Sequence, residues 1–136
     1  MAIKVRWEGG STFVGETDGG SKVTMEPGPK YGGSGRNPTP MELVAIAHGG
    51  CTGIDIILIM QKMRVSLTKL EIDVETKRRE EPPTYYEEIK LTYTASGEGV
   101  TEDNLRKAVE LSHEKYCSVG AMLEEKAKIS YDIKIV

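Results

Sequence analysis

The chain has 136 residues, of which 38 % are hydrophobic and 29 % charged, and its formal net charge is −3 at pH 7. This length fits a single domain over residues 1–136, and the composition is that of an ordinary soluble globular protein. The small acidic excess argues against nucleic acid and anionic membranes as partners. We expect no secretory signal, because the first residues lack an apolar core. The expected compartment is therefore the cytoplasm, where cysteines stay reduced.

The first 38 residues are predicted to form three short strands and a loop. Residues 3–7 alternate between apolar and charged side chains, and this period of two indicates a half-buried strand. Residues 12–16 and 22–26 are predicted to be two further strands. Residues 27–38 contain three prolines together with several glycines, a composition that is typical of a loop.

Residues 39–64 are predicted to form one long central helix. Thr39 is a suitable N-cap, with Pro40 at the first helical position and Glu42 three residues after the cap. Apolar side chains cover nearly the whole circumference, which is typical of a buried helix. Three glycines around Cys51 weaken the helix and favour a bend or a break just before that residue.

The remaining residues are predicted to form a hairpin, two helices and a closing strand. Residues 70–75 and 85–93 flank a Pro-Pro pair and are predicted to pair with each other. Thr101 is a suitable N-cap for a helix with acidic residues in its first turn, and a short helix is predicted from Ser118. Residues 129–135 alternate again and form the last strand. These separate runs of strands and helices indicate an α+β fold with antiparallel sheet.

The apolar central helix also bears on the oligomeric state. A helix that is apolar on all sides needs more cover than one sheet and two short helices provide. A second copy of the chain would supply that cover. We therefore expect a homodimer with a large apolar interface.

The two cysteines, Cys51 and Cys117, are the candidate catalytic residues. Cys117 directly precedes the N-terminus of the short helix, where unpaired N–H groups favour a thiolate. Peroxide reduction needs an attacking thiol and a resolving thiol, because the sulfenic acid formed on the first condenses with the second to a disulfide. On spacing alone, two inert core thiols are the more common arrangement.

Two histidines lie near the cysteines in the chain. His48 precedes Cys51 by three residues on the same helix face. It is either a base or thiolate partner, or a hydrogen-bonded histidine at the dimer interface, and we favour the second interpretation. His113 is expected to cap the last turn of its helix. The CxxC and HxxxH spacings of zinc sites are absent, so we expect neither a metal nor a cofactor.

Two motifs resemble those of the OsmC/Ohr family. NPTPMEL at 37–43, followed by AHGGC at 47–51, is similar to the family's central-helix signature. HEKYCSV at 113–119 is similar to its second-cysteine signature. The order of predicted elements agrees with the family along the whole chain. The resemblance implies an OsmC-like α+β fold, with antiparallel sheets around long central helices in an intertwined homodimer.

The resemblance also implies an activity. Members of this family reduce organic hydroperoxides in the defence against oxidative stress. By this resemblance Cys51 is the reactive cysteine and Cys117 the resolving thiol. A small apolar hydroperoxide is then the substrate, and a dithiol, often a lipoyl group, regenerates the disulfide.

The chain departs from the family's peroxidase pattern at two positions. Ten residues before the reactive cysteine, the family has a glutamate that anchors an arginine; here that position is Met41, next to Glu42. The family arginine follows a Gly-Gly pair near the first strand; here Ser11 follows it, which leaves Arg6 and Arg36 as replacements. The chain therefore resembles a divergent branch. Other thiol or persulfide chemistry, and a non-catalytic binding dimer, stay open as alternatives.

Overall fold

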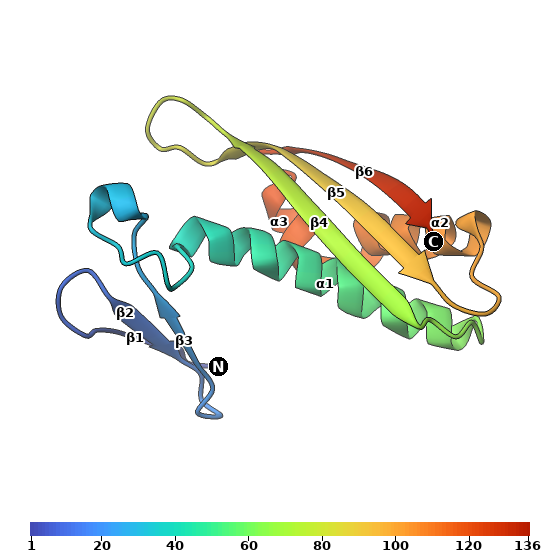
Figure 1. Cartoon of the computed structure of the whole chain (residues 1–136), viewed down its shortest axis with the longest axis horizontal. Coiled ribbons are helices and arrows are strands. Elements are labelled where there is room, and N and C mark those ends of the chain that lie inside the picture. The colour runs from blue at the N-terminus through green and yellow to red at the C-terminus, as the bar shows by residue number, and fades with distance from the viewer. The chain divides into compact units, whose positions relative to one another are not determined.

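The computed structural model describes all residues from 1 to 136. The chain divides into two compact units, residues 1–44 and residues 45–136. The boundary between them falls inside the long helix α1 (Pro40–Lys62). The predicted α+β class is confirmed (Figure 1). A single domain over the whole chain stays a prediction.

The first unit contains a three-stranded antiparallel sheet in the order β1–β2–β3. β1 spans Lys4–Trp7, β2 spans Phe13–Glu16 and β3 spans Lys22–Met25, so the three predicted strands are confirmed. The alternation in β1 predicted a half-buried face. Val5 and Trp7 of that face are nevertheless 57 % and 65 % exposed. The apolar face of β1 therefore has little cover in a single chain.

The loop before α1 is held by one buried carboxylate. Glu26 accepts hydrogen bonds from the backbone N–H and the hydroxyl of Ser34. A single 3-10 turn, η1 (Pro29–Tyr31), interrupts the loop. α1 then begins with the predicted capping box: Thr39 Oγ1 accepts the Glu42 N–H at 3.1 Å, and Glu42 Oε1 accepts the Thr39 N–H at 2.9 Å.

The second unit contains a three-stranded sheet in the order β4–β5–β6. β4 (Lys69–Arg78) and β5 (Tyr86–Ser96) form the predicted antiparallel hairpin. β6 (Lys128–Ile135) instead pairs with β5 in parallel, so the sheet is mixed rather than purely antiparallel. The parallel pairing follows from the chain path, because α2 (Glu102–Leu111) and α3 (Ser118–Leu123) form the crossover between β5 and β6.

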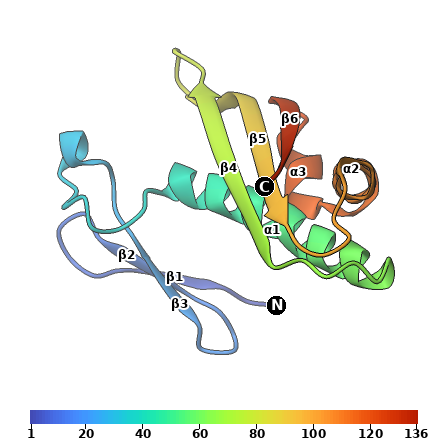
Figure 2. The same ribbon diagram turned by 45° about the vertical axis from the view of Figure 1, so that its right-hand side comes forward.

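The helices of the second unit cover one face of its sheet (Figures 1 and 2). Alternate residues of β5 point to that face, while the polar residues between them point away. The core therefore lies between the sheet and the helices. Its largest buried apolar side chains come from β5, α1 and α2: Ile89, Leu91, Tyr93, Ile56, Met60, Leu105 and Val109.

α1 runs unbroken through its glycines, so the predicted bend or break before Cys51 is wrong. Two of the glycines instead let strand β4 approach the helix closely. A Cβ at Gly49 would lie 3.1 Å from Val74 Cγ2, and a Cβ at Gly53 would lie 2.9 Å from Ile72 Cδ1. Any side chain at these positions would push the helix and the strand apart.

α1 is buried along one face only. Its buried residues recur at helical spacing on the side toward the sheet: His48, Gly49, Thr52, Ile56 and Met60. On other faces, Ile46, Ile54 and Leu58 are 60 %, 64 % and 53 % exposed. By length and composition α1 could cross a membrane. The core helix of a soluble protein meets the same criterion, and the packing against β4 favours that interpretation.

The close packing of α1 on β4 can be tested at neighbouring glycines. Gly49→Val should destabilise the protein by about 1–3 kcal/mol, because the added side chain overpacks the contact with Val74. Gly50→Val is the matched control, since a Cβ there meets nothing within 4 Å. Its effect should stay within about 1 kcal/mol. Urea unfolding at one fixed protein concentration measures both, and equal stability of the two variants would contradict the close contact.

Candidate functional site

Cys51 and Cys117 lie side by side in the second unit. Cys51 is on α1 and partly exposed. Cys117 is 5 % exposed, ends the π-helical turn η2 (Ser112–Tyr116) and is the N-cap of α3. Cys51 lies close enough to Cys117 to raise the pKa of the Cys117 thiol, and neither cysteine is in a disulfide. The structure therefore brings together the two residues that the sequence singles out.

Cys117 keeps its proton at neutral pH. Burial raises the pKa of this thiol to about 11, and the nearby Cys51 and Asp55 act in the same direction. The Gly120 N–H donates to Cys117 Sγ at 3.2 Å, which lowers the pKa but does not offset burial. The prediction of a thiolate at Cys117 is therefore wrong. A single hydrogen bond from a short helix does not replace the lost hydration.

The turn η2 carries Cys117 to its place. The Cys117 N–H donates to the carbonyl oxygen of Ser112 at 2.8 Å, a hydrogen bond that spans five residues. Such a π-turn is wider than a turn of α-helix and occurs frequently at functional sites. Nothing in the sequence pattern indicates this turn, because the run of residues is also compatible with an α-helix.

A chain of hydrogen-bonded side chains lies beside the thiols. Tyr93 OH lies 3.0 Å from Thr52 Oγ1 and 2.7 Å from His113 Nε2. Ser112 Oγ lies 2.8 Å from Thr52 Oγ1 and 2.9 Å from Asp55 Oδ2. These contacts link α1, β5 and η2 through their side chains. Burial raises the pKa of Tyr93, so its hydroxyl stays protonated.

Both histidines are neutral at pH 7. His48 is 1 % exposed, burial lowers its pKa, and its Nδ1 has no hydrogen-bond partner within the chain. Burial and the neighbouring His48 lower the pKa of His113 to about 4. His113 contacts Tyr93 OH and lies 4.9 Å from the ring of Tyr131. Its predicted role as a cationic helix cap is therefore wrong.

A cavity of about 390 Å³ opens beside Cys117. Both histidines, Gly120 and Tyr131 are among the residues that line it. Gly120 leaves room between a sulfur and an imidazole: a Cβ there would lie 3.2 Å from both Cys117 Sγ and His48 Nε2. The cavity therefore borders the Cys117 side chain, while that residue itself stays almost fully buried.

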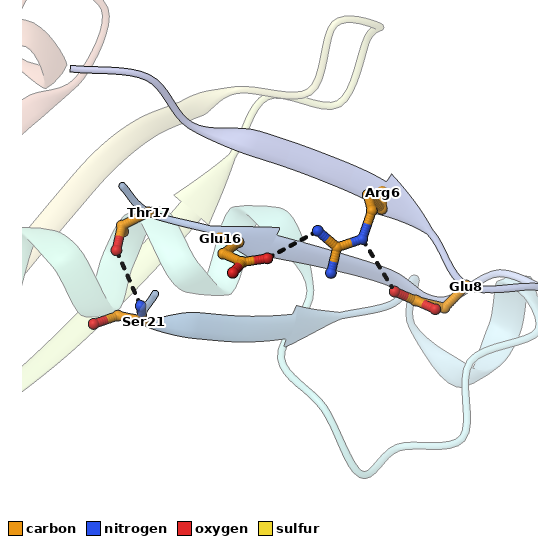
Figure 3. A network of polar contacts seen from close by, with 5 residues as sticks. All are labelled: Arg6, Glu8, Glu16, Thr17 and Ser21. Carbon is orange, nitrogen blue, oxygen red and sulfur yellow. Dashed lines mark hydrogen bonds and ion pairs between the residues drawn. The ribbon is translucent and has the colours of Figure 1, made fainter. Parts of the chain in front are cut away.

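Two of the residues considered near the family's glutamate and arginine positions, Glu42 and Arg6, have other partners. Glu42 caps its own helix. Arg6 lies 2.9 Å from Glu16 and 3.6 Å from Glu8, within the β1–β2–β3 unit (Figure 3). Arg36 is exposed in the loop before α1. The side chains of Arg6 and Glu42 are therefore engaged in local contacts of the first unit.

The sequence did not predict three residues of the site: Thr52, Tyr93 and Ser112. Thr52 falls among the glycines, and Tyr93 falls on the apolar face of a strand, so each pattern predicts only packing. One signal was available for Thr52, because apart from His48 the other residues on the buried face of α1 are apolar or glycine. A buried hydroxyl needs a hydrogen-bond partner and so points to others nearby.

Acidification should destabilise the fold through His113. Its pKa of about 4 in the folded protein lies below the ordinary value of 6.5, so the unfolded chain binds the proton first. The contribution of neutral His113 to the free energy of unfolding is fully present above pH 6.5 and is lost as the pH falls from 6.5 to 4. The loss is at most about 3 kcal/mol, and screening by solvent makes it smaller. His113→Gln should flatten this part of the curve. Urea unfolding from pH 7 to 4.5 measures the slope, and an unchanged slope in the variant would contradict the assignment.

The chain is similar to known proteins in both sequence and structure. The family model described as OsmC-like protein matches residues 33–132. Protein YhfA of Escherichia coli (strain K12) is 38 % identical over 137 residues, with 100 % of this chain and 98 % of YhfA covered. A hypothetical protein from Aquifex aeolicus VF5 has a crystal structure with a TM-score of 0.83 and 35 % identity, covering 99 % of this chain and 96 % of that one.

A more distant likeness shows the fold alone. The Legionella pneumophila protein named organic hydroperoxide resistance protein OsmC is 19 % identical, with a TM-score of 0.72 and coverage of 98 % and 95 % of the two chains. The residues matched by the family model include both cysteine motifs, at 37–51 and 113–119. The family that these motifs predicted is therefore confirmed: the chain belongs to the family of OsmC-like proteins.

Proposed function

We propose that the protein is a cysteine-based peroxidase that reduces organic hydroperoxides, with Cys51 as the attacking thiol and Cys117 as the resolving thiol. The observation that carries the proposal is the proximity of two free thiols within one chain. The Legionella protein named for organic hydroperoxide resistance adds support at the level of the fold. A role in the defence against oxidative stress follows from this chemistry.

The different environments of the two thiols favour this division of roles. Cys117 is almost fully buried and protonated at neutral pH, which suits the thiol that acts second. Cys51 is partly exposed, so it is the sulfur that a peroxide can reach first. Cys117 also lies close enough to intercept an oxidised Cys51 before further oxidation.

The proposed reaction has two steps before regeneration. The Cys51 thiolate attacks the peroxide, an S–O bond forms, the O–O bond breaks, and the alkoxide takes a proton and leaves as the alcohol. The Cys117 sulfur then attacks the Cys51 sulfenic acid, an S–S bond forms, and the hydroxyl group leaves as water with the Cys117 proton. A dithiol, for which a lipoyl-type group is suitable, exchanges with the disulfide and restores both thiols.

We further propose that the protein acts as a homodimer in the cytoplasm. The exposed apolar side chains of α1 include Ile46, Ile54 and Leu58. Together with the exposed face of β1, they leave more apolar surface than is usual for a soluble monomer. A second copy of the chain would cover this surface. The cytoplasm fits a soluble protein that keeps two free thiols.

A second candidate function is favoured by one observation. The side chains of Arg6 and Glu42 bind elsewhere in the first unit, so they are poor substitutes for the family's arginine and glutamate. The second candidate is persulfide chemistry, in which Cys51 accepts a sulfur atom from a donor. The arginine and glutamate belong to the family's peroxidase pattern, so their loss counts against peroxide reduction and not against this reaction. A non-catalytic binding dimer is the remaining alternative, and thiols that stay unreactive in the folded protein would support it.

The peroxidase proposal predicts a rapid two-thiol reaction. One equivalent of cumene hydroperoxide at neutral pH should remove both free thiols within seconds and lower the mass by two hydrogens. Hydrogen peroxide, the parallel control, should react more slowly. Intact-protein mass spectrometry with a free-thiol count measures both reactions.

Two cysteine variants separate the roles. Cys51→Ser should lose the reaction, whereas Cys117→Ser should react once and hold a sulfenic acid that a dimedone probe captures. If the wild-type thiols survive the peroxide, the peroxidase proposal fails. A Cys51 that takes up sulfur from a persulfide donor under the same conditions would then support the second candidate.

If the proposed homodimer forms through α1, a lysine should weaken association at an exposed apolar position on α1 but not at one on α3. Ile54→Lys on α1 should weaken association, because it places a charge in the proposed interface. Met122→Lys on α3 is the matched control, since the wild-type side chains are 64 % and 69 % exposed. Sedimentation velocity across a dilution series measures the association of each. A monomeric wild type, or equal effects of both substitutions, would contradict the proposed interface.

A further inference from the structure

Two hydrogen bonds connect the neighbour of Cys51 to the backbone of Cys117. Thr52 follows Cys51 on α1, and its Oγ1 lies 2.8 Å from Ser112 Oγ. The carbonyl oxygen of Ser112 accepts the Cys117 N–H at 2.8 Å. This path, which we call the Thr52–Ser112 bridge, ties the element that carries one thiol to the element that carries the other.

The bridge lies in the protein core. Thr52 and Ser112 each have 0 % exposure, so water does not compete for their hydroxyl groups. Hydrogen bonds in such surroundings are stronger than at the surface, and the loss of one partner leaves a polar group unpaired. Asp55 and Tyr93 each contact one end of the pair, so both hydroxyl groups have two partners.

Packing alone does not account for these two residues. The buried face of α1 is mostly apolar or glycine, and a hydroxyl group there is unfavourable unless it is paired. Ser112 opens the π-turn, where its side chain contacts α1 while its carbonyl oxygen accepts the Cys117 N–H. One residue thus couples the position of the helix to the position of the cysteine.

We propose that the Thr52–Ser112 bridge positions the thiol pair, holding Cys117 against Cys51 and raising the effective concentration of one thiol at the other. Thr52 and Ser112 are positioning residues, since neither is proposed to touch the peroxide. The inference rests on the dithiol chemistry of the proposed function. It concerns the equilibrium of the disulfide rather than the peroxide step, so the two can be tested separately.

The equilibrium with dithiothreitol gives a direct measure of this positioning. Oxidised dithiothreitol accepts two electrons and two protons from Cys51 and Cys117, which join in an S–S bond, and becomes the reduced dithiol. The equilibrium constant rises with the effective concentration of one protein thiol at the other. It needs no peroxide, and mass spectrometry after acid quenching and alkylation measures the two forms.

Thr52→Val removes the hydroxyl group at nearly constant volume. We expect the equilibrium constant for disulfide formation to fall about tenfold, the effect of losing the buried hydrogen bond to Ser112. The bond to Tyr93 is lost as well, and the Tyr93→Phe variant measures its separate effect. Thr52→Ser keeps the hydroxyl group and should remain within about threefold of the wild type. This rescue by the conservative variant separates the hydrogen bond from the shape of the side chain.

Two further variants control for general loosening of the core. Ile56→Val shortens another fully buried side chain, one turn along α1, without touching the bridge. Tyr93→Phe removes the hydroxyl group that contacts Thr52 from the other side but leaves the contact between Thr52 and Ser112. Both should change the equilibrium constant by less than about threefold, even where they lower the stability of the fold.

The outcomes are distinct. An unchanged equilibrium constant in Thr52→Val, or an equal fall in Ile56→Val, would overturn the inference, as would a wild type that forms no disulfide between Cys51 and Cys117. A tenfold fall in Thr52→Val alone supports it. If that fall is seen in a protein that ignores organic hydroperoxides, the peroxidase proposal fails while the positioning role stands.

Discussion

The packing of α1 against the β4–β6 sheet is the contact on which the other features of the second unit depend. Gly49 and Gly53 allow the helix to lie close to β4, and the buried face of the helix, which includes Thr52, packs against the sheet. Thr52 then meets Tyr93 of β5, and Cys51 lies within reach of the turn that carries Cys117. A wider separation between α1 and β4 would leave the hydroxyl groups unpaired and the sulfurs apart. The glycines therefore stabilise the site indirectly, because they allow the helix and the strand to pack closely.

Loss of hydration is the dominant influence on the polar groups at this site. It raises the pKa of Cys117 and Tyr93 and lowers the pKa of His48 and His113, so all four are uncharged at neutral pH. Loss of hydration therefore disfavours a thiolate at Cys117, which agrees with its proposed role as the thiol that acts second. It also explains why the short helix α3 leaves Cys117 protonated: the Gly120 N–H acts against a larger and opposite effect.

The sequence predicted the features that depend on local chemistry and missed those that depend on how the elements meet. The capping box at Thr39, the N-cap at Thr101 and the β4–β5 hairpin follow from short patterns, and all are present. The proximity of Cys51 and Cys117 came from the family resemblance, since a separation of 66 positions along the chain carries no geometric information. The π-turn, the neutral His113 and the Thr52–Ser112 bridge could not be predicted, because each arises from burial among residues far apart in the chain.

The parallel pairing of β6 with β5 has a consequence for the order in which the site is assembled. Residues 97–127, which include Cys117, form the crossover between these strands, and the crossover is closed only when the last strand docks on β5. A connection of this kind is a non-local contact and forms late compared with a hairpin. During synthesis Cys51 emerges well before its partner thiol, so the nascent chain carries a single unpaired cysteine. We therefore expect the site to be completed late in folding, when the C-terminal strand docks and closes the crossover that includes Cys117.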